Sequence, residues 1–336
     1  MGMAIVGTGR FAASRIVPAL TRAQGCTLRA VISRSRERAA AFAEEHGIPR
    51  AYDDLAAALA DPAVEGLWVA TPHNLHREVV EAGAAARKHI LCEKPLATTV
   101  EDATAMVTAC RRAGVALGTG FHLRHHPLHQ EVRRLIATGA AGHVLCADAE
   151  WSLETPVGAG APWRTDIAVA GGGIMTGTVV HIIDLMRSVL DDEPVEVAAF
   201  TDADSSPVSP VETRAVVQMR FARGTLATVR GVRPARAPAN DLVIEGTAAH
   251  IIGRGTIDEA SRGRLDVTGA DAELSGVPAG TDMYARQAEA FARAIYAGEE
   301  PNASGWDGLR AVEVTTAVYE AARMRRAVAI PPARRR

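Results

Sequence analysis

Three observations predict an α/β fold followed by a second, sheet-rich domain. Up to residue 121, short apolar runs alternate with helical patterns, which is typical of a parallel, doubly wound sheet. Beyond residue 121, strand-like segments are mostly joined by short turns, which favours antiparallel pairing. The length of 336 residues leaves room for both parts. We therefore expect a Rossmann domain over 1–121, an α+β domain with a large open, mainly antiparallel sheet over 122–330, and a tail over 331–336.

The first strand, over residues 3–6, leads directly into a glycine-rich turn. The turn reads Gly7-Thr8-Gly9-Arg10-Phe11-Ala12 and is followed by a helix toward residue 23. This is the G-x-G-x-x-A form of the dinucleotide fingerprint, in which Gly7 allows the tight turn and Gly9 lets the backbone approach a pyrophosphate. Ala12 permits close packing of helix on strand, and the helix N-terminus attracts phosphate. A plain glycine turn is the alternative.

The second strand, over 28–32, ends without the acidic residue that usually binds the ribose of NAD. Ser33, Arg34 and Arg38 stand there instead. Guanidinium groups match phosphate geometry bidentately. We interpret these residues as a pocket for a 2′-phosphate and expect NADP(H) rather than NAD(H) as the cofactor. An ordinary charged helix start is the alternative interpretation.

The remainder of the first domain continues to alternate helices with strands. The expected strands cover 66–69, 90–92 and 115–118. Two helices are expected before the first of these strands, one over 36–46 that ends at Gly47 and one over 55–59 that is capped by Asp53. A helix capped by Asn74 follows, and a last helix begins at a capping box of Thr98 and Glu101 and ends at Gly114.

The strand over 90–92 is followed by Glu93, Lys94 and Pro95. A lysine at the carboxyl end of a parallel strand lies where open α/β sheets bind ligands. Pro95 restricts the backbone of Lys94 to extended conformations. In isolation the tripeptide also fits a solvated turn, because Lys and Glu are mostly exposed. The glycine-rich turn before it and a Gly-Gly-Gly…His…Asp run after it favour a functional site.

The second domain begins with a polar segment over 122–127 and a helix through Ile136. The segment holds three histidines, but no His, Cys and carboxylate set has the spacing of a tetrahedral site, so we expect no metal. The expected strands cover 144–151, 195–200, 213–221, 225–232, 241–245, 250–252 and 264–267. Two helices complete the domain, one with an apolar stripe from Tyr284 to Ile295 and one over 306–321.

A glycine triplet precedes a helix that carries a histidine in the second domain. Residues 171–173 let this segment pass close to a ligand or to another backbone. The helix that follows places Gly177, His181 and Asp184 near one face. His181 is an acid/base candidate because the ordinary pKa of histidine lies near neutrality. A core histidine with satisfied hydrogen bonds is the alternative.

These motifs together resemble the glucose–fructose oxidoreductase/inositol dehydrogenase (Gfo/Idh/MocA) family over nearly the whole chain. The resemblance implies hydride transfer between a nicotinamide cofactor and a carbinol or ketone, usually of a sugar or cyclitol. It implies that Lys94 lies beside the reacting oxygen and that His181 gives or takes the proton. It further implies that the cofactor and substrate are bound by Thr71, Pro72, His73, His76, Glu93, Lys94, His122, Trp163 and Arg164, and that the substrate also meets Gly177, His181 and Tyr284.

Two positions depart from the family pattern. His73 stands where relatives often have asparagine, and Gly177 stands where relatives usually carry an aspartate four residues before the histidine. An NADP(H)-dependent oxidoreductase acting on a keto-sugar, polyol or cyclitol is our first hypothesis. A member that binds the cofactor as a sensor or assembly protein is the second, and a cofactor-assisted lyase or glycosidase is the third.

The composition restricts location and partners. A formal net charge of -2 gives no bulk attraction to nucleic acid or anionic membrane. The four cysteines are scattered, as expected of reduced thiols, and we expect a cytoplasmic protein with neither a signal peptide nor a membrane span. The family resemblance adds an expectation of a homodimer or homotetramer that assembles through the C-terminal sheet.

Overall fold

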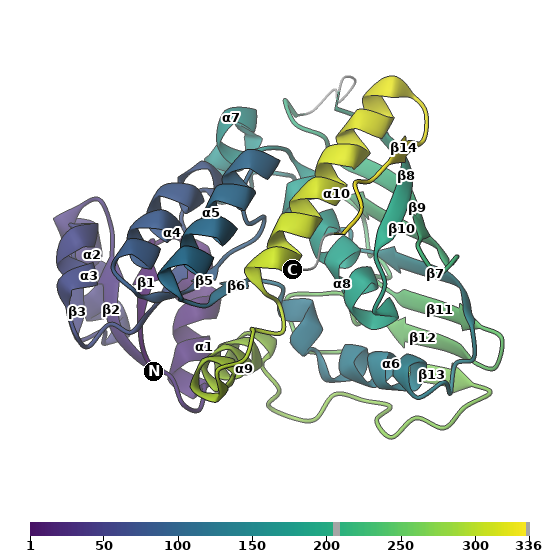
Figure 1. Ribbon diagram of the computed structural model, residues 1–336, viewed down its shortest axis with the longest axis horizontal. Helices are drawn as coiled ribbons and strands as arrows, with labels where there is room; N and C mark the ends of the chain where they lie inside the picture. The colour runs from purple at the N-terminus through teal and green to yellow at the C-terminus, as the bar shows by residue number, and fades with distance from the viewer. Residues whose placement is uncertain (204–208, 334–336) are drawn as a thin grey trace. The chain divides into compact units, whose positions relative to one another are not determined.

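The computed structural model describes residues 1–203 and 209–333, and the expected arginine-rich end at 334–336 lies outside them. Contacts divide the chain into two compact units (Figure 1). Unit 1 comprises Met1–Gly120 and Tyr284–Leu309, and unit 2 comprises Phe121–Met283 and Arg310–Arg336.

Unit 1 is built on a six-stranded parallel sheet in the order β3-β2-β1-β4-β5-β6. This is the strand order of a Rossmann fold, so the predicted doubly wound sheet is confirmed. Its strands are β1 (Gly2–Val6), β2 (Thr27–Ile32), β3 (Arg50–Tyr52), β4 (Gly66–Val69), β5 (His89–Cys92) and β6 (Leu117–Thr119).

The helices of unit 1 cover both faces of this sheet (Figure 1). They are η1 (Ala12–Ile16), α1 (Val17–Arg22), α2 (Arg36–His46), α3 (Leu55–Ala60), η2 (His73–Leu75), α4 (His76–Ala85), α5 (Val100–Ala113) and α9 (Met283–Ala297). Helices α4 and α5 pack together on one face. On the other face, Tyr284, Ala288 and Phe291 of α9 join the apolar side chains of η1 and α1 in one core. The predicted apolar stripe of α9 therefore packs in that core.

Several boundaries and caps differ from the prediction. The cap of α3 is Asp54 and not Asp53, because Asp54 accepts hydrogen bonds from the backbone N–H groups of Ala56 and Ala57. The cap of α5 is Thr99 and not Thr98, and it accepts from the N–H of Asp102.

Two further differences come from short, irregular elements. Asn74 caps no helix, because it lies inside the 3-10 turn η2, and α4 begins only at His76. Strand β3 was missed because a three-residue strand has no readable alternation. The ends of α2 and α5 were predicted correctly, since Gly47 and Gly114 adopt the left-handed conformation there.

Unit 2 is built on an eight-stranded sheet in the order β13-β12-β11-β7-β10-β9-β8-β14. Only β7 and β10 pair in parallel, and the other neighbours are antiparallel. The strands are β7 (Val144–Glu150), β8 (Pro194–Thr201), β9 (Arg214–Phe221), β10 (Leu226–Val232), β11 (Leu242–Gly246), β12 (His250–Arg254), β13 (Arg264–Thr268) and β14 (Val328–Ala329). The mainly antiparallel sheet is confirmed, and only the two-residue β14 was missed.

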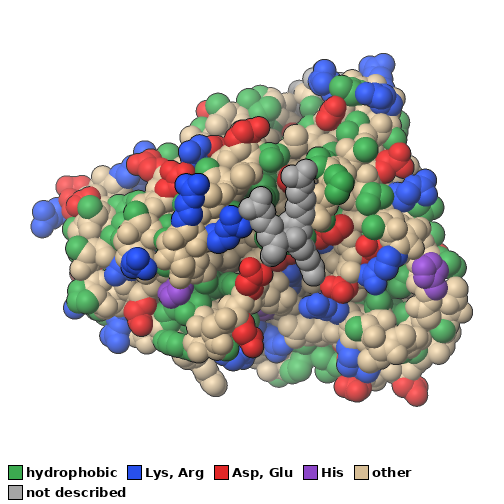
Figure 2. Space-filling view, in the orientation of Figure 1, with side chains coloured by type: hydrophobic (Ala, Val, Ile, Leu, Met, Phe, Trp, Pro, Cys, Tyr) green, Lys and Arg blue, Asp and Glu red, His purple; other side chains and the backbone are tan. Residues whose placement is uncertain are grey.

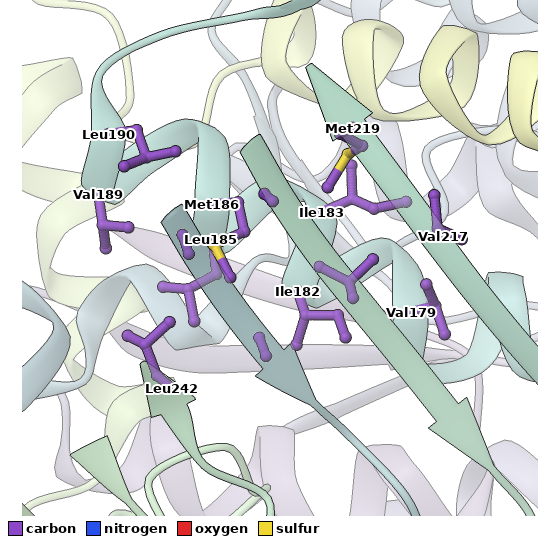
Figure 3. Close-up of a cluster of buried hydrophobic side chains, with 14 of the residues drawn as sticks. Val179, Ile182, Ile183, Leu185, Met186, Val189, Leu190, Val217, Met219 and Leu242 are labelled. Atoms are coloured by element: carbon purple, nitrogen blue, oxygen red, sulfur yellow. The ribbon is translucent and has the colours of Figure 1, made fainter. Parts of the chain in front are cut away.

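One face of the unit 2 sheet carries the helices and the core. The helical elements are η3 (His122–His125), α6 (Pro127–Ala137), η4 (Pro162–Thr165), α7 (Ile167–Ala170), η5 (Met175–Val179), α8 (Val180–Leu190) and α10 (Gly305–Met324). Figure 3 shows side chains of α8 meeting Val217, Met219 and Leu242 of the sheet. The other face alternates exposed residues, as Val216, Gln218 and Arg220 do along β9.

The stretch Ile167–Leu190 is long and apolar enough to cross a membrane by length and composition alone. Most of it is buried inside unit 2, and it is divided among α7, the glycine triplet, η5 and α8. It is therefore better explained as a core segment. Figure 2 shows acidic and basic side chains interspersed over the visible face.

Candidate active site

The glycine-rich turn of unit 1 has the geometry that the fingerprint requires. Gly7 has φ +117°, and a Cβ there would lie 2.7 Å from the carbonyl oxygen of Ala70. A Cβ on Gly9 would meet no atom of the described residues within 4 Å. The turn is thus packed on one side and open on the other. Ala12 is buried at the start of a π-helical turn, as close helix packing demands.

Three more predicted cofactor residues lie at the carboxyl ends of strands in the same sheet. Thr8 follows β1 and donates a hydrogen bond to Ser33, which follows β2, at 3.3 Å. Thr71 follows β4, and its Oγ1 is buried with no hydrogen-bond partner among the described residues. Such a buried hydroxyl is a ready donor or acceptor for a ligand. An open glycine turn with polar groups at neighbouring strand ends fits a dinucleotide.

The arginines of the predicted 2′-phosphate pocket are exposed and have no ion-pair partner within residues 1–203 and 209–333. Arg34 lies just beyond β2, and Arg38 lies in the first turn of α2. Ser35 caps that helix by accepting from the N–H of Arg38. Both guanidinium groups are accordingly available to an anion beside Ser33. Arg10 is also exposed, at the end of the glycine turn.

Lys94 is positioned by a buried carboxylate next to it in the chain. Glu93 follows β5 and accepts a hydrogen bond from the indole Nε1 of Trp68 at 3.0 Å. A Cβ on Gly120 would lie 2.8 Å from the Glu93 carboxylate, so a larger residue there would displace this carboxylate. The Lys94–Pro95 peptide bond is cis, and Lys94 is partly exposed. Glu93 therefore fixes the backbone from which Lys94 projects.

His76 is completely buried and joins two loops of unit 1. Its Nδ1 lies 3.1 Å from the carbonyl oxygens of Pro95 and Leu96, and its Nε2 lies 3.1 Å from that of Thr71. Burial lowers the pKa of His76 below its ordinary value, and the charge of Lys94 adds to this. The ring connects the loop after β4 with the loop that carries Lys94. The ring of His73 lies 5.7 Å away from it.

The glycine triplet of unit 2 is explained by a buried Glu–Tyr pair. Glu212 is 1% exposed and accepts from the N–H of Gly173 at 2.7 Å, the N–H of Met175 at 3.1 Å and the hydroxyl of Tyr319 at 2.8 Å. A Cβ on Gly172 would lie 1.9 Å from the Tyr319 hydroxyl, and one on Gly173 would lie 2.1 Å from the Glu212 carbonyl oxygen. The glycines are therefore needed because this segment passes close to other protein atoms. This is the second of the two explanations that the sequence analysis offered, the first being a ligand.

His181 lies within a cluster of buried aromatic rings in unit 2. Its ring centroid is 4.7 Å from that of His122, 4.9 Å from that of Trp151 and 6.0 Å from that of Phe121. His122 is placed by η3, where its Nε2 lies 3.3 Å from the carbonyl oxygen of Asp258. The structure thus brings together two predicted site residues, His122 and His181, in an apolar setting.

Gly177 lies one turn before His181, inside the π-helical turn η5. A Cβ there would meet no described atom within 4 Å, so the position opens onto free space. Asp166 and Asp184 are two carboxylates of unit 2 that could replace the missing aspartate, but both have other partners. Asp166 caps α7 through the N–H of Ala168. Asp184 is held by Arg124 at 2.6 and 2.7 Å and by Arg187 at 3.2 Å.

The other predicted site residues lie on η4 and on α9. Trp163 and Arg164 form η4, where the guanidinium carbon lies 4.8 Å from the indole centroid. Tyr284 is buried in the core of unit 1, edge-on to Phe11 with centroids 5.7 Å apart.

His126 and His129, near the start of unit 2, make hydrogen bonds to residues far along the chain. His126 Nε2 lies 3.0 Å from the Arg262 carbonyl oxygen, and His129 Nε2 lies 3.1 Å from the Thr256 hydroxyl. No group of three metal-binding side chains occurs in the described part of the chain. The histidines instead connect the start of unit 2 with the loop after β12.

Sequence reasoning missed three residues of unit 2, two that shape the glycine triplet and one that lies beside His181. Glu212 lies in an irregular segment and Tyr319 lies on a helix far along the chain, so no pattern links either to the glycine triplet. Trp151 was assigned to the end of a strand. A large aromatic residue at a carboxyl strand end, on the strand that opens the second sheet, was the signal that could have identified it.

The comparisons with known proteins agree with this architecture. Residues 1–121 match a model described as an oxidoreductase family with an NAD-binding Rossmann fold, GFO_IDH_MocA. Residues 129–252 match the GFO/IDH/MocA C-terminal domain. The chain is an NAD(P)-dependent oxidoreductase. More specifically, it belongs to the Gfo/Idh/MocA family, as its motifs predicted.

Relatives in this family act on sugars. The motifs at residues 117–119, 122–124, 163–164 and 189–194 predict a likeness to 1,5-anhydro-D-fructose reductase, and the comparison confirms it. The chain is 33% identical to that enzyme from Ensifer adhaerens, over 95% of each chain. It is 29% identical to D-xylose 1-dehydrogenase (NADP(+)) 2 from Haloferax volcanii, over 96% of this chain and 97% of that one. The crystal structure of aldose-aldose oxidoreductase from Caulobacter crescentus, complexed with glycerol, has a TM-score of 0.88 and 29% identity, with 98% of this chain and 99% of that chain covered.

Proposed function

We propose that the chain is an NADP(H)-dependent oxidoreductase that exchanges hydride with a carbon of a keto-sugar, polyol or cyclitol. The observation that carries this proposal is the common sheet edge in unit 1. Strands β1 and β5 both pair in parallel with β4, so the glycine turn and Lys94 leave the sheet at the same edge. A lysine is thereby presented beside a dinucleotide cradle.

Selectivity for NADP(H) is supported by the exposed guanidinium groups of Arg34 and Arg38 beside Ser33. One charge-assisted hydrogen bond to a 2′-phosphate contributes about 1.5–3 kcal/mol, or roughly a 10- to 100-fold preference. Fluorescence titration with NADPH and NADH tests this directly. Equal affinities, or tighter binding of NADH, would refute the assignment.

The proton chemistry belongs to Lys94 and His181. When bound, the nicotinamide supplies or accepts the hydride. Lys94 holds the substrate oxygen by a charged hydrogen bond and stabilises the negative charge that develops on it. His181 gives a proton to that oxygen during reduction and takes it back during oxidation. The rings of His122, Trp151 and Phe121 exclude water around His181, which strengthens its hydrogen bonds.

The free space beside Gly177 also supports a second candidate function. A carboxylate at this position would orient the imidazole of His181 and stabilise its protonated form. Glycine gives neither effect, which favours a member that binds the cofactor as a sensor or assembly protein. We favour the enzyme, in which this space accommodates a group of the substrate, because Lys94, Trp163, Arg164 and His181 are all retained.

A panel of ketoses, polyols and cyclitols distinguishes the two functions. The protein is incubated with NADPH or NADP+ and each compound, and the nicotinamide absorbance is followed. We expect turnover of at least one compound, at a rate that Lys94→Ala strongly reduces. Tight NADPH binding without turnover of any compound would favour the sensor. Product formation without net consumption of NADPH would favour the lyase or glycosidase.

Assembly through the open face of the unit 2 sheet is the second part of the proposal. Phe200 is 77% exposed and pairs across the strands with the exposed Val216. Leu226 and Leu145 add further exposed apolar side chains to the sheet strands. We expect a cytoplasmic homodimer or homotetramer. Phe200→Glu should then lower the mass measured by light scattering, and an unchanged monomeric mass for both proteins would contradict assembly.

A further inference from the structure

The indole nitrogen of Trp151 is a buried donor whose hydrogen bond is not made within the protein. Trp151 is 2% exposed, and its Nε1 has no hydrogen-bond partner in residues 1–203 or 209–333. Buried polar groups are satisfied in the great majority of cases, so an exception calls for a reason. In contrast, the buried indole nitrogen of Trp68 donates to Glu93.

The backbone around Trp151 is held firmly on both sides. Its N–H donates to the carbonyl oxygen of Arg230 at 3.0 Å, and its carbonyl oxygen accepts from the Thr178 hydroxyl at 3.3 Å. The next residue, Ser152, exchanges two backbone hydrogen bonds with the side chain of Asn240, at 2.9 and 3.1 Å. The Ser152 hydroxyl also accepts from the N–H of Val232. The indole is thus fixed in place by a satisfied network.

This rigid indole lies next to the proposed proton donor. Its centroid is 4.9 Å from that of His181 and 5.7 Å from that of His122. The Thr178 hydroxyl that binds the Trp151 carbonyl belongs to the same turn as Gly177, whose missing side chain leaves free space. A ligand bound beside the His181 ring would therefore also lie beside the Trp151 ring, which is fixed in place and carries one unmet donor.

We propose that the Trp151 indole N–H donates a hydrogen bond to an oxygen of a polyhydroxylated substrate, at a position other than the reacting carbon. This inference rests on the proposed function for the identity of the reaction, and it adds a residue that selects the substrate. A preorganised donor of this kind discriminates against analogues that lack its acceptor, because the donor then stays unsatisfied. Trp151 is accordingly a specificity residue, whereas His181 moves the proton.

The indole N–H resonances report on this contact without any need for turnover. The chain has four tryptophans, and comparison of the indole-¹⁵N spectrum with that of Trp151→Phe assigns the resonance of Trp151. D-fructose, D-sorbitol and myo-inositol are added in turn to the protein with NADP+. We expect at least one of them to shift the Trp151 resonance and to leave that of Trp306, assigned through Trp306→Phe, unchanged. A Trp151 resonance that no compound moves, up to saturating concentrations, would overturn the proposal.

Kinetic measurements provide a second, independent test of the hydrogen bond from Trp151. Trp151→Phe keeps a ring but removes the donor, and replacement by benzothienylalanine removes it while keeping the indole shape. For the compound that shifts the resonance, we expect either change to lower kcat/KM, or the affinity where no turnover occurs, by about 5- to 150-fold. NADPH affinity and the Trp306→Phe control should stay unchanged. An unaltered kcat/KM or affinity in the benzothienylalanine variant would contradict the inference. A shifted Trp151 resonance without turnover would support the inference and refute only the proposed redox function.

Discussion

Tyr319→Phe removes one hydroxyl from the pair that shapes the glycine triplet, and its effect on stability should depend on pH. In the native protein the Tyr319 hydroxyl donates to Glu212 at 2.8 Å. Burial raises the pKa of Glu212 above its ordinary value, while the hydroxyl and the N–H groups of Met175 and Gly173 oppose that rise. Burial and the Glu212 carboxylate hold the pKa of Tyr319 well above 10, so it remains a donor throughout the neutral range.

The direction in which the stability changes with pH follows from proton linkage. A carboxyl group whose pKa is raised by folding costs stability as the pH rises through the folded value. Removing the hydroxyl raises the pKa of Glu212 further and therefore increases this cost at higher pH. Loss of a hydrogen bond to a charged group amounts to about 1.5–3 kcal/mol, which we expect at pH 8. At pH 4, below the ordinary pKa of a glutamate, the carboxyl is largely protonated in the folded and the unfolded protein, and only the loss of a neutral hydrogen bond remains, about 0.5–1.5 kcal/mol.

Urea denaturation or calorimetry at the two pH values measures this difference. For a unit of this size the loss at pH 8 corresponds to a Tm lower by about 3–12 °C. Tyr296→Phe is the matched control, because its side chain is exposed, and it should change stability by less than about 0.5 kcal/mol. Equal destabilisation by Tyr319→Phe at both pH values would refute the role assigned to the Glu212 charge.

Three further predictions concern the site itself. Lys94→Ala should lower kcat by about 10²- to 10⁴-fold while NADPH affinity stays near that of the native protein, and a variant with most of its turnover would remove Lys94 from the chemistry. Ser33→Asp should reduce the preference for NADPH because the new carboxylate repels the 2′-phosphate. Ala40→Asp adds the same charge at an exposed position of α2 and should leave the preference unchanged. Equal effects of the two variants in fluorescence titrations would indicate that the total charge of the protein is responsible instead. Gly177→Asp should fold, since its Cβ meets free space, and should lower turnover of the native substrate if that space accommodates the substrate; new ketose reduction by an otherwise inactive protein would contradict this.

The alternation of apolar runs with helices, and later with turns, was sufficient to predict both sheets. Most strands of unit 2 were located within a residue or two because one face is buried, which gives a clear alternation along β9 and β10. The caps of α3 and α5 were misplaced by one residue because adjacent Asp-Asp and Thr-Thr pairs offer equal side chains to either position. Only the backbone hydrogen bonds decide between them.

The candidate site was predictable where its residues lie close in sequence and unpredictable where they do not. The glycine turn and the segment around Lys94 are continuous motifs, and their geometry follows from local backbone rules. The glycine triplet was recognised, but the reason for it depends on Glu212 and Tyr319, which tertiary packing brings to it. The π-helical turns at Ala12–Ile16 and Met175–Val179 also lack a sequence signature, and π-turns are frequent at functional sites.

Transfer of deuterium from the cofactor tests the central claim most directly. NADPH is prepared with deuterium at either face of nicotinamide C4, and the product formed from a reduced ketose is analysed by mass spectrometry and NMR. We predict that one of the two labelled forms places a single deuterium on the former carbonyl carbon for each NADPH oxidised, and that Lys94→Ala slows this transfer. A product that carries no label from either form, or that appears without oxidation of NADPH, would contradict the assignment of this chain as a sugar oxidoreductase.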